Sequence, residues 1–168
     1  MVASPPPDTV TIIDLNVKPP KVVAELNVPT SVVGPPMSVA VSPDESLALV
    51  TRASKLDPAD ATKVVADDTL TVIDLKASPP AVVATLKAGA GASGVSFNKQ
   101  GTLVLVANRN EGTVSVFTVS GKTLTPAGMV KLGDDKSGPS HAMFAPDGKS
   151  ALVTRDGDST ISLLAIDG

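Results

Sequence analysis

The sequence predicts an all-β fold built from a repeated strand. A seven-residue pattern that begins with Thr and continues with alternating apolar residues occurs four times, at residues 9–15, 69–75, 113–119 and 160–166. The copies begin at Thr9, Thr69, Thr113 and Thr160, separated by 60, 44 and 47 residues. A four-stranded blade of a β-propeller takes about 40–50 residues. The repeat therefore predicts a β-propeller of four-stranded antiparallel blades.

The segments between the Thr strands predict the other strands of each blade. A turn that contains Pro or Gly separates each Thr strand from the next strand, at Lys21–Leu26, Ala81–Leu86 and Ala127–Leu132. A short apolar strand follows and ends in a turn, at Met37–Val41, Ser93–Phe97 and His141–Phe144. The last strand before the Thr strand returns is expected at Leu47–Thr51, Leu103–Ala107 and Ala151–Thr154. This order gives thirteen strands, in groups of two, four, four and three.

Residues 53–66 do not fit the repeat, because the first repeat is longer than the second by 16 residues. We expect a long surface loop there, with one or two helical turns in Ala59–Val65 as the alternative. Little or no helix is expected elsewhere. The acid pairs Asp67-Asp68 and Asp134-Asp135 are expected in solvated turns.

Composition excludes several classes of function. Hydrophobic residues make up 42% of the 168 residues, but the chain has three Phe and no Trp or Tyr, and its net charge is −3. Binding of single-stranded nucleic acid requires aromatic stacking and a basic groove, so no nucleic-acid partner is expected. The absence of Cys removes disulfides and thiol chemistry. No apolar run approaches the ~20 residues of a membrane helix, and Met1–Pro7 lacks a signal-peptide pattern, which leaves the compartment open.

The repeat resembles the YVTN-type β-propeller family, which includes the lactonase-like seven-bladed propellers. The matching motifs are Ser42-Pro43-Asp44, Phe144-Ala145-Pro146-Asp147-Gly148 and Val82-Val83-Ala84-Thr85-Leu86. The resemblance implies that residues 1–168 form a single partial propeller domain of a little over three blades, which begins and ends within a blade. An open half-propeller exposes apolar blade faces and unpaired strand edges. We therefore expect a homodimer that completes the ring.

The three Arg residues are predicted to lie on one face of the propeller, because alternate loops of an antiparallel meander share a face. Arg52 and Arg155 each stand nine positions after a turn Pro, and Asn108 takes the equivalent place before Arg109. Guanidinium groups gathered on this face could bind a carboxylate or phosphate. The alternative is that each Arg pairs with a neighbouring loop acid, such as Asp156, Glu111 or Asp57, or bonds loop carbonyls.

His141 is the only His, and it stands in Gly138-Pro139-Ser140-His141 at the entry of a first strand. Lactonase-like propellers have a similar Gly-Pro-Arg-His motif, so the resemblance implies a catalytic His141, with Ser140 in place of the Arg. Asp156 is the substitute for the acidic residue that the family carries after the next strand. A neutral His beside a carboxylate can act as a general base toward water. The alternative is a hydrogen-bonded His at a strand end.

Two further motifs do not support a cofactor or metal. Gly89–Gly94 reads G-x-G-x-x-G, but only Val95–Gly101 follows before the next strand, which is too short for the helix of a dinucleotide site. Asp156-Gly-Asp158 with Asp167 lacks the Gly that a calcium loop requires at its sixth place. No cofactor and no metal site are expected.

The sequence thus predicts a β-propeller that acts as a binding or interaction scaffold for a small anionic ligand. The expected ligand-binding residues on the loop face are Arg52, Asn108, Arg109, Ser140 and Arg155. The alternatives are a lactone hydrolase similar to phosphogluconolactonase, with His141 and Asp156 as catalytic residues, and a structural cell-surface repeat protein.

Overall fold

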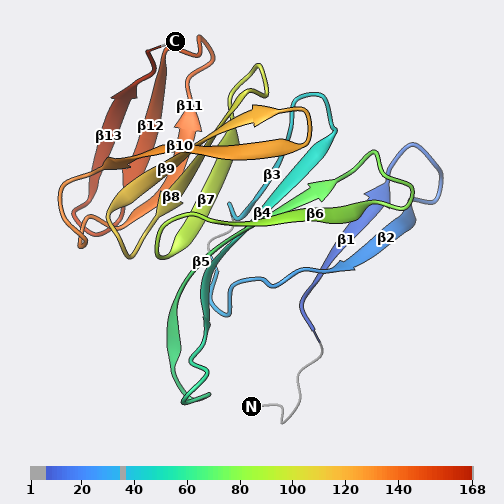
Figure 1. Cartoon of the computed structure of the whole chain (residues 1–168), viewed down its shortest axis with the longest axis horizontal. Helices are drawn as coiled ribbons and strands as arrows, with labels where there is room; N and C mark the ends of the chain where they lie inside the picture. Colours follow the sequence, from blue (N-terminus) through green and yellow to red (C-terminus); the bar gives the residue numbers. More distant parts are fainter. Residues whose placement is uncertain (1–6, 35–36, 168) are drawn as a thin grey trace.

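A computed structural model describes residues 7–34 and 37–167, which form thirteen strands in four antiparallel sheets (Figure 1). Each sheet is one complete or partial blade. The two complete blades are the middle ones. The sheets run β1 (Thr9–Asp14) and β2 (Lys21–Asn27); β3 (Val39–Val41), β4 (Leu47–Leu56), β5 (Val64–Asp74) and β6 (Ala81–Lys87); β7 (Ala92–Phe97), β8 (Leu103–Asn108), β9 (Thr113–Ser120) and β10 (Thr123–Lys131); and β11 (Pro139–Phe144), β12 (Ser150–Arg155) and β13 (Thr160–Ala165).

The structure confirms the all-β fold and the predicted grouping into two, four, four and three strands. Within each sheet the strands follow one another in chain order, as in a meander. The inner strands β3, β7 and β11 lie side by side, and the amide of Val95 in β7 donates to the carbonyl of Met37, just before β3, at 3.2 Å. None of the described residues forms a helix that could span a membrane.

The expectation of a loop at residues 53–66 holds only for residues 57–63, and the alternative of helical turns is wrong. β4 and β5 instead extend into a long hairpin, which projects from the second blade in Figure 1. A register shift after Arg52 lets the ladder continue, with Leu56 opposite Val64. The carboxylates of Asp57 and Asp60 accept backbone amides in the tip, at 2.8 and 3.1 Å. Side chains that satisfy turn amides in this way stabilise a tight connection, so the extra residues lengthen the two strands.

The turn between the first two strands contains Pro43 in the second blade but no Pro in the third blade. Side-chain hydrogen bonds explain why both turns form. In the second blade the Ser42 hydroxyl accepts the amide of Leu47 at 2.9 Å and donates to Asp44 at 2.7 Å. This hydroxyl is the main reason that the pKa of Asp44 is lowered to about 2. In the third blade Asn98 stands in the place of Ser42, and its side-chain oxygen accepts the amide of Leu103 at 3.0 Å. A side-chain acceptor therefore holds both turns.

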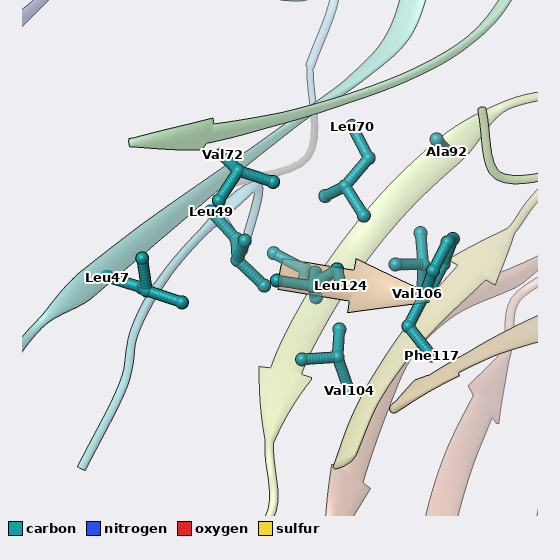
Figure 2. Packing of buried hydrophobic residues seen from close by; sticks show 10 residues of the cluster. Leu47, Leu49, Leu70, Val72, Ala92, Val104, Val106, Phe117 and Leu124 are labelled. Carbon is teal, nitrogen blue, oxygen red and sulfur yellow. The ribbon is translucent and has the colours of Figure 1, made fainter. Parts of the chain in front are cut away.

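The described residues form three hydrophobic core clusters, each between two neighbouring blades. The largest joins the second and third blades; it contains Leu49 and Val72 of the second blade and Val106, Phe117 and Leu124 of the third (Figure 2). A second cluster joins the third and fourth blades, and a third joins the first hairpin to the second blade. Full burial of one such side chain contributes about 1.5–3 kcal/mol. The stability of the fold therefore depends on contacts between blades.

Candidate functional site

The Arg residues lie on one face, here called the loop face, where second strands meet third strands and the linkers enter the inner strands. Arg52 lies within β4, Arg155 ends β12, and Arg109 follows β8 directly. Each pairs with a different carboxylate: Arg52 with Asp67 at 3.7 Å, Arg109 with Asp156, and Arg155 with Asp158. The three guanidinium groups are thus held in separate ion pairs rather than in one ring.

The pair formed by Arg52 is largely enclosed. The side chain of Asp67 is only 3% exposed, and Lys55 contacts the same carboxylate at 3.2 Å. Burial alone would raise the pKa of Asp67, but the Thr69 hydroxyl and the Lys55 ammonium outweigh it and hold the pKa below its ordinary value. Arg52 also donates to the carbonyl of Thr30 at 3.1 Å. The expectation of a solvated turn is therefore wrong for Asp67, which anchors the linker and the hairpin.

Arg155 is also enclosed, with 19% of its side chain exposed. Besides Asp158, it donates to the Ser162 hydroxyl at 3.2 Å. Its guanidinium group lies over Gly133 of the preceding blade, where an added Cβ would stand 3.1 Å from Nη2. Both partners of Arg155 lie in the fourth blade, so its ion pair holds the turn between β12 and β13.

Asn108 has no exposed surface. Its side-chain oxygen accepts the amide of Gly89 at 3.0 Å, and its nitrogen donates to the hydroxyls of Thr113 and Ser115 at 2.9 and 2.8 Å. Glu111 accepts the neighbouring amide of Ala90 at 2.8 Å. The Gly-rich segment is therefore hydrogen-bonded to the residues between β8 and β9. The side-chain amide of Asn108 has all of these partners within the protein.

The remaining candidates form what we call the Arg109 cluster: Arg109, Ser140, Thr154 and Asp156, from the third and fourth blades. The Ser140 hydroxyl lies 3.0 Å from the carboxylate of Asp156 and 2.8 Å from the Thr154 hydroxyl. The side chains of Arg109 and Asp156 are 46% and 50% exposed. Hydrogen bonding by Arg109 is the main cause that holds the pKa of Asp156 below its ordinary value. This cluster is the one part of the predicted site where a charged pair remains open to solvent.

His141 follows Ser140 directly and pairs with Thr154 across β11 and β12. Both of its ring nitrogens are buried, and neither has a hydrogen-bond partner in the described part of the chain. Burial lowers its pKa below 6.5, so the ring is neutral at pH 7. The described residues include no hydrogen bond between His141 and Asp156, and no cluster of acids and His that could hold a metal ion. His141 is thus a neutral ring with two unused polar atoms.

Sequence reasoning missed Gly94 and Thr154. The inner strand β7 comes so close to β11 that a Cβ on Gly94 would stand 2.6 Å from the carbonyl oxygen of Ser140 and 2.8 Å from Cα of His141. The last Gly of the G-x-G-x-x-G motif was the available signal, since a Gly within a strand often marks a close backbone approach. Thr154 carried no signal beyond its place one residue before Arg155.

Sequence reasoning also missed a cleft of about 320 Å³ between the second and third blades, lined in part by Asp68, Lys87, Glu111 and Met129. Lys87 pairs there with Asp68 at 3.1 Å, and Glu111 accepts the amide of Ala90. Its charged groups are therefore already partnered.

Comparison with known proteins identifies relatives of the fold. The sequence model of the family described as "Lactonase, 7-bladed beta-propeller" matches residues 67–168. No curated protein gives a significant sequence match. Three solved structures illustrate the likeness.

The chain is similar to the periplasmic gluconolactonase PpgL of Pseudomonas aeruginosa, with 18% identity and a TM-score of 0.67 over 97% of this chain and 48% of that one. It is similar to a putative 6-phosphogluconolactonase of Bacteroides uniformis, with 15% identity and a TM-score of 0.70 over 95% and 48%. A hydrazine synthase of Kuenenia stuttgartiensis gives 20% identity and a TM-score of 0.68 over 94% and 40%. The chain spans less than half the length of each of these proteins.

Proposed function

The chain belongs to the lactonase family of seven-bladed β-propellers, and we propose that it is a binding scaffold whose loop face takes a small hydroxy acid at the Arg109 cluster. The observation that carries the proposal is the half-exposed pair of Arg109 and Asp156, which joins the third and fourth blades and whose carboxylate also accepts the Ser140 hydroxyl. Arg52 and Arg155 are enclosed in their own ion pairs.

The charges of the Arg109 cluster indicate which chemical groups its ligand must carry. In the described residues Arg109 uses only Nη1 for a hydrogen bond, so its other N–H groups can reach a carboxylate in two-point fashion. A bare anion would be repelled by Asp156, whose lowered pKa keeps it charged. A ligand hydroxyl that donates to this carboxylate removes the conflict, because each carboxylate oxygen accepts more than one hydrogen bond. A carboxylate with neighbouring hydroxyl groups meets both requirements.

Calorimetric titration with gluconate tests this proposal, with hexanoate as the matched acid that lacks hydroxyls. Gluconate should bind and hexanoate should not. Hydrogen bonds to charged groups contribute about 1.5–3 kcal/mol, so Arg109→Gln should weaken gluconate binding by about tenfold or more. Arg52→Gln is the control, since it removes an Arg of the same face without touching the cluster. Equal gluconate affinity in wild type and Arg109→Gln would reject the site.

A second candidate is hydrolysis of a lactone, favoured by the two unpartnered nitrogens of the neutral His141. A neutral imidazole can take a proton from a water that attacks a lactone carbonyl. If this is the activity, the chain should hydrolyse glucono-1,5-lactone above the spontaneous rate. His141→Gln should then remove the excess, since general-base catalysis contributes about 10²–10⁴-fold. A wild-type rate equal to that of buffer rejects hydrolysis and leaves the scaffold.

A further inference from the structure

The fourth blade exposes side chains that are buried at the equivalent positions of the other blades. Leu70 and Val72 of β5 have no exposed surface, because the third blade covers them. The same repeat positions in β13 are Ile161 and Leu163, which are 66% and 70% exposed. Leu152 of β12 is 51% exposed, whereas its equivalents Leu49 and Leu105 are 0% and 1% exposed, and Met143 of β11 is 54% exposed. We call the exposed set the last-blade face; it consists of Met143, Leu152, Ile161 and Leu163.

The first strands of the chain also expose apolar side chains, at positions that in the third blade pack against the preceding blade. Ile13 of β1 is 49% exposed, whereas its equivalent Phe117 in β9 is 1% exposed. Val39 of β3 is 52% exposed, whereas its equivalent Val95 in β7 is 2% exposed. The reason is that, within residues 7–34 and 37–167, the β1–β2 sheet has no inner strands that could cover β3. We call this set the first-blade face; it consists of Ile13, Leu15, Val39 and Val41.

The two faces are complementary, since the chain already packs such faces together twice. Leu49 and Val95 share the cluster between the second and third blades, and Leu105 and Ala142 share the cluster between the third and fourth. By equivalence, Leu152 of the last-blade face matches Val39 of the first-blade face. An apolar patch of this kind is typical of a protein interface. A chain that carries both halves of one contact is suited to binding a second copy of itself.

We propose that two copies of this chain dock end to start, so that β11 and β12 of each copy supply the two inner strands that the β1–β2 blade of the other lacks. Each sheet also offers an unpaired backbone edge there, since β1 and β13 each have one neighbour. β1 and β13 are both third strands of a blade. At each junction between the two copies, called a seam here, only one of them can pair with β12. The same contact made twice closes a ring of six blades with two strands left over. This oligomer is independent of the ligand proposed above.

Light scattering coupled to gel filtration tests the proposal on the full 168-residue chain. The wild type at tens of micromolar should show twice the monomer mass of 16.9 kDa. Leu152→Glu and Val39→Lys should each give a monomer, because each places a charge in an apolar contact. Val82→Glu, at a 42% exposed position of the outer strand β6, is the matched control and should stay dimeric.

Mixing the two monomeric variants gives the decisive result. End-to-start docking brings the two introduced charges, which have opposite signs, against each other at one seam and leaves the other seam unaltered. An equal mixture of L152E and V39K should therefore recover the dimer. Circular dichroism should show native sheet content for both variants, since both positions are more than half exposed. A wild type of monomeric mass at every concentration, or a mixture that stays monomeric, overturns the proposal. Indefinitely growing assemblies overturn the closed ring.

Discussion

The strands β5 and β13 contain the same Thr-initiated pattern but occupy different environments. In β5, Leu70 is fully buried against the third blade, while its equivalent Ile161 in β13 is 66% exposed. From Thr69 to Asp74 in β5 and from Thr160 to Ala165 in β13, the pairing with the preceding strand is antiparallel and without a register shift. Sheet formation therefore requires only the local pattern, whereas burial requires the next blade. Stability in such a repeat is close to a sum of contacts between neighbours.

The largest expected difference between these regions concerns core side chains. Leu70→Ala should lower the free energy of unfolding by about 2–5 kcal/mol, because it leaves a cavity between two blades. Leu163→Ala should lower it by less than about 1 kcal/mol in dilute solution, because that side chain is 70% exposed. Urea unfolding at submicromolar protein measures both. Equal losses would show that the last blade is as well covered as the second.

Gly94→Ala should lower the free energy of unfolding by up to about 3 kcal/mol, because the new methyl group would meet the backbone of Ser140, which cannot move aside as a side chain can. Ser38 is the matched control. It occupies the equivalent position just before β3 and already has a Cβ, so Ser38→Ala should change little. Thermal unfolding of both variants compares the contact between the third and fourth blades with the uncovered edge of the second. An unchanged midpoint for Gly94→Ala would contradict the close approach.

The enclosed ion pair of Asp67 and the half-exposed ion pair of Asp156 should differ by a smaller amount in their contribution to the free energy of unfolding. Asp67→Asn should lower the free energy of unfolding by about 2 kcal/mol, because Arg52 and Lys55 lose the charge of a carboxylate that is 3% exposed. Asp156→Asn should lower it by less than about 1 kcal/mol, because its pair with Arg109 is half exposed and screened by solvent. Urea unfolding at two salt concentrations measures both. A larger loss for Asp156→Asn would mean that the Arg109 cluster is structural.

The smallest effect is a pH dependence that arises from His141. Burial lowers its pKa in the folded state below 6.5, so the unfolded chain binds a proton at a higher pH than the folded chain does. The free energy of unfolding should therefore fall as the pH drops from 6.5 to 5. The carboxylates of lowered pKa, such as Asp156, reduce stability only as the pH falls below about 5. Unfolding of wild type and His141→Gln across this range measures the effect, and parallel curves would contradict it.

The strands were predictable because their signal is local. Period-two alternation after Thr9, Thr69, Thr113 and Thr160, with Pro or Gly in the turns, indicates strands without any knowledge of neighbours. The hairpin at residues 53–66 was not predicted, because its Lys, Asp and Pro residues resemble a loop. Its pairing depends on a register shift next to Arg52, which no local pattern shows.

The site was predictable only in part. Connectivity placed the three Arg residues on one face, and Asp156 was among the loop acids expected to pair with an Arg, but its pairing with Arg109 of the preceding blade was not predicted. The partners of Arg52 and Arg155 depend on the paths of the loops, and they proved to be Asp67 and Asp158. The state of His141 depends on the approach of β7, where Gly94 lies against it. The sequence pattern therefore does not determine the contacts between residues of different blades.

Amide hydrogen exchange at two protein concentrations tests the central claim, that the outer blades are built to be covered as the inner ones are. At submicromolar protein, amides of β13 should exchange faster than those of β9, which lies within a complete blade and between two others. At tens of micromolar, protection in β13 should rise toward that of β9, while β9 stays unchanged. Exchange in β13 that is the same at both concentrations would contradict the account.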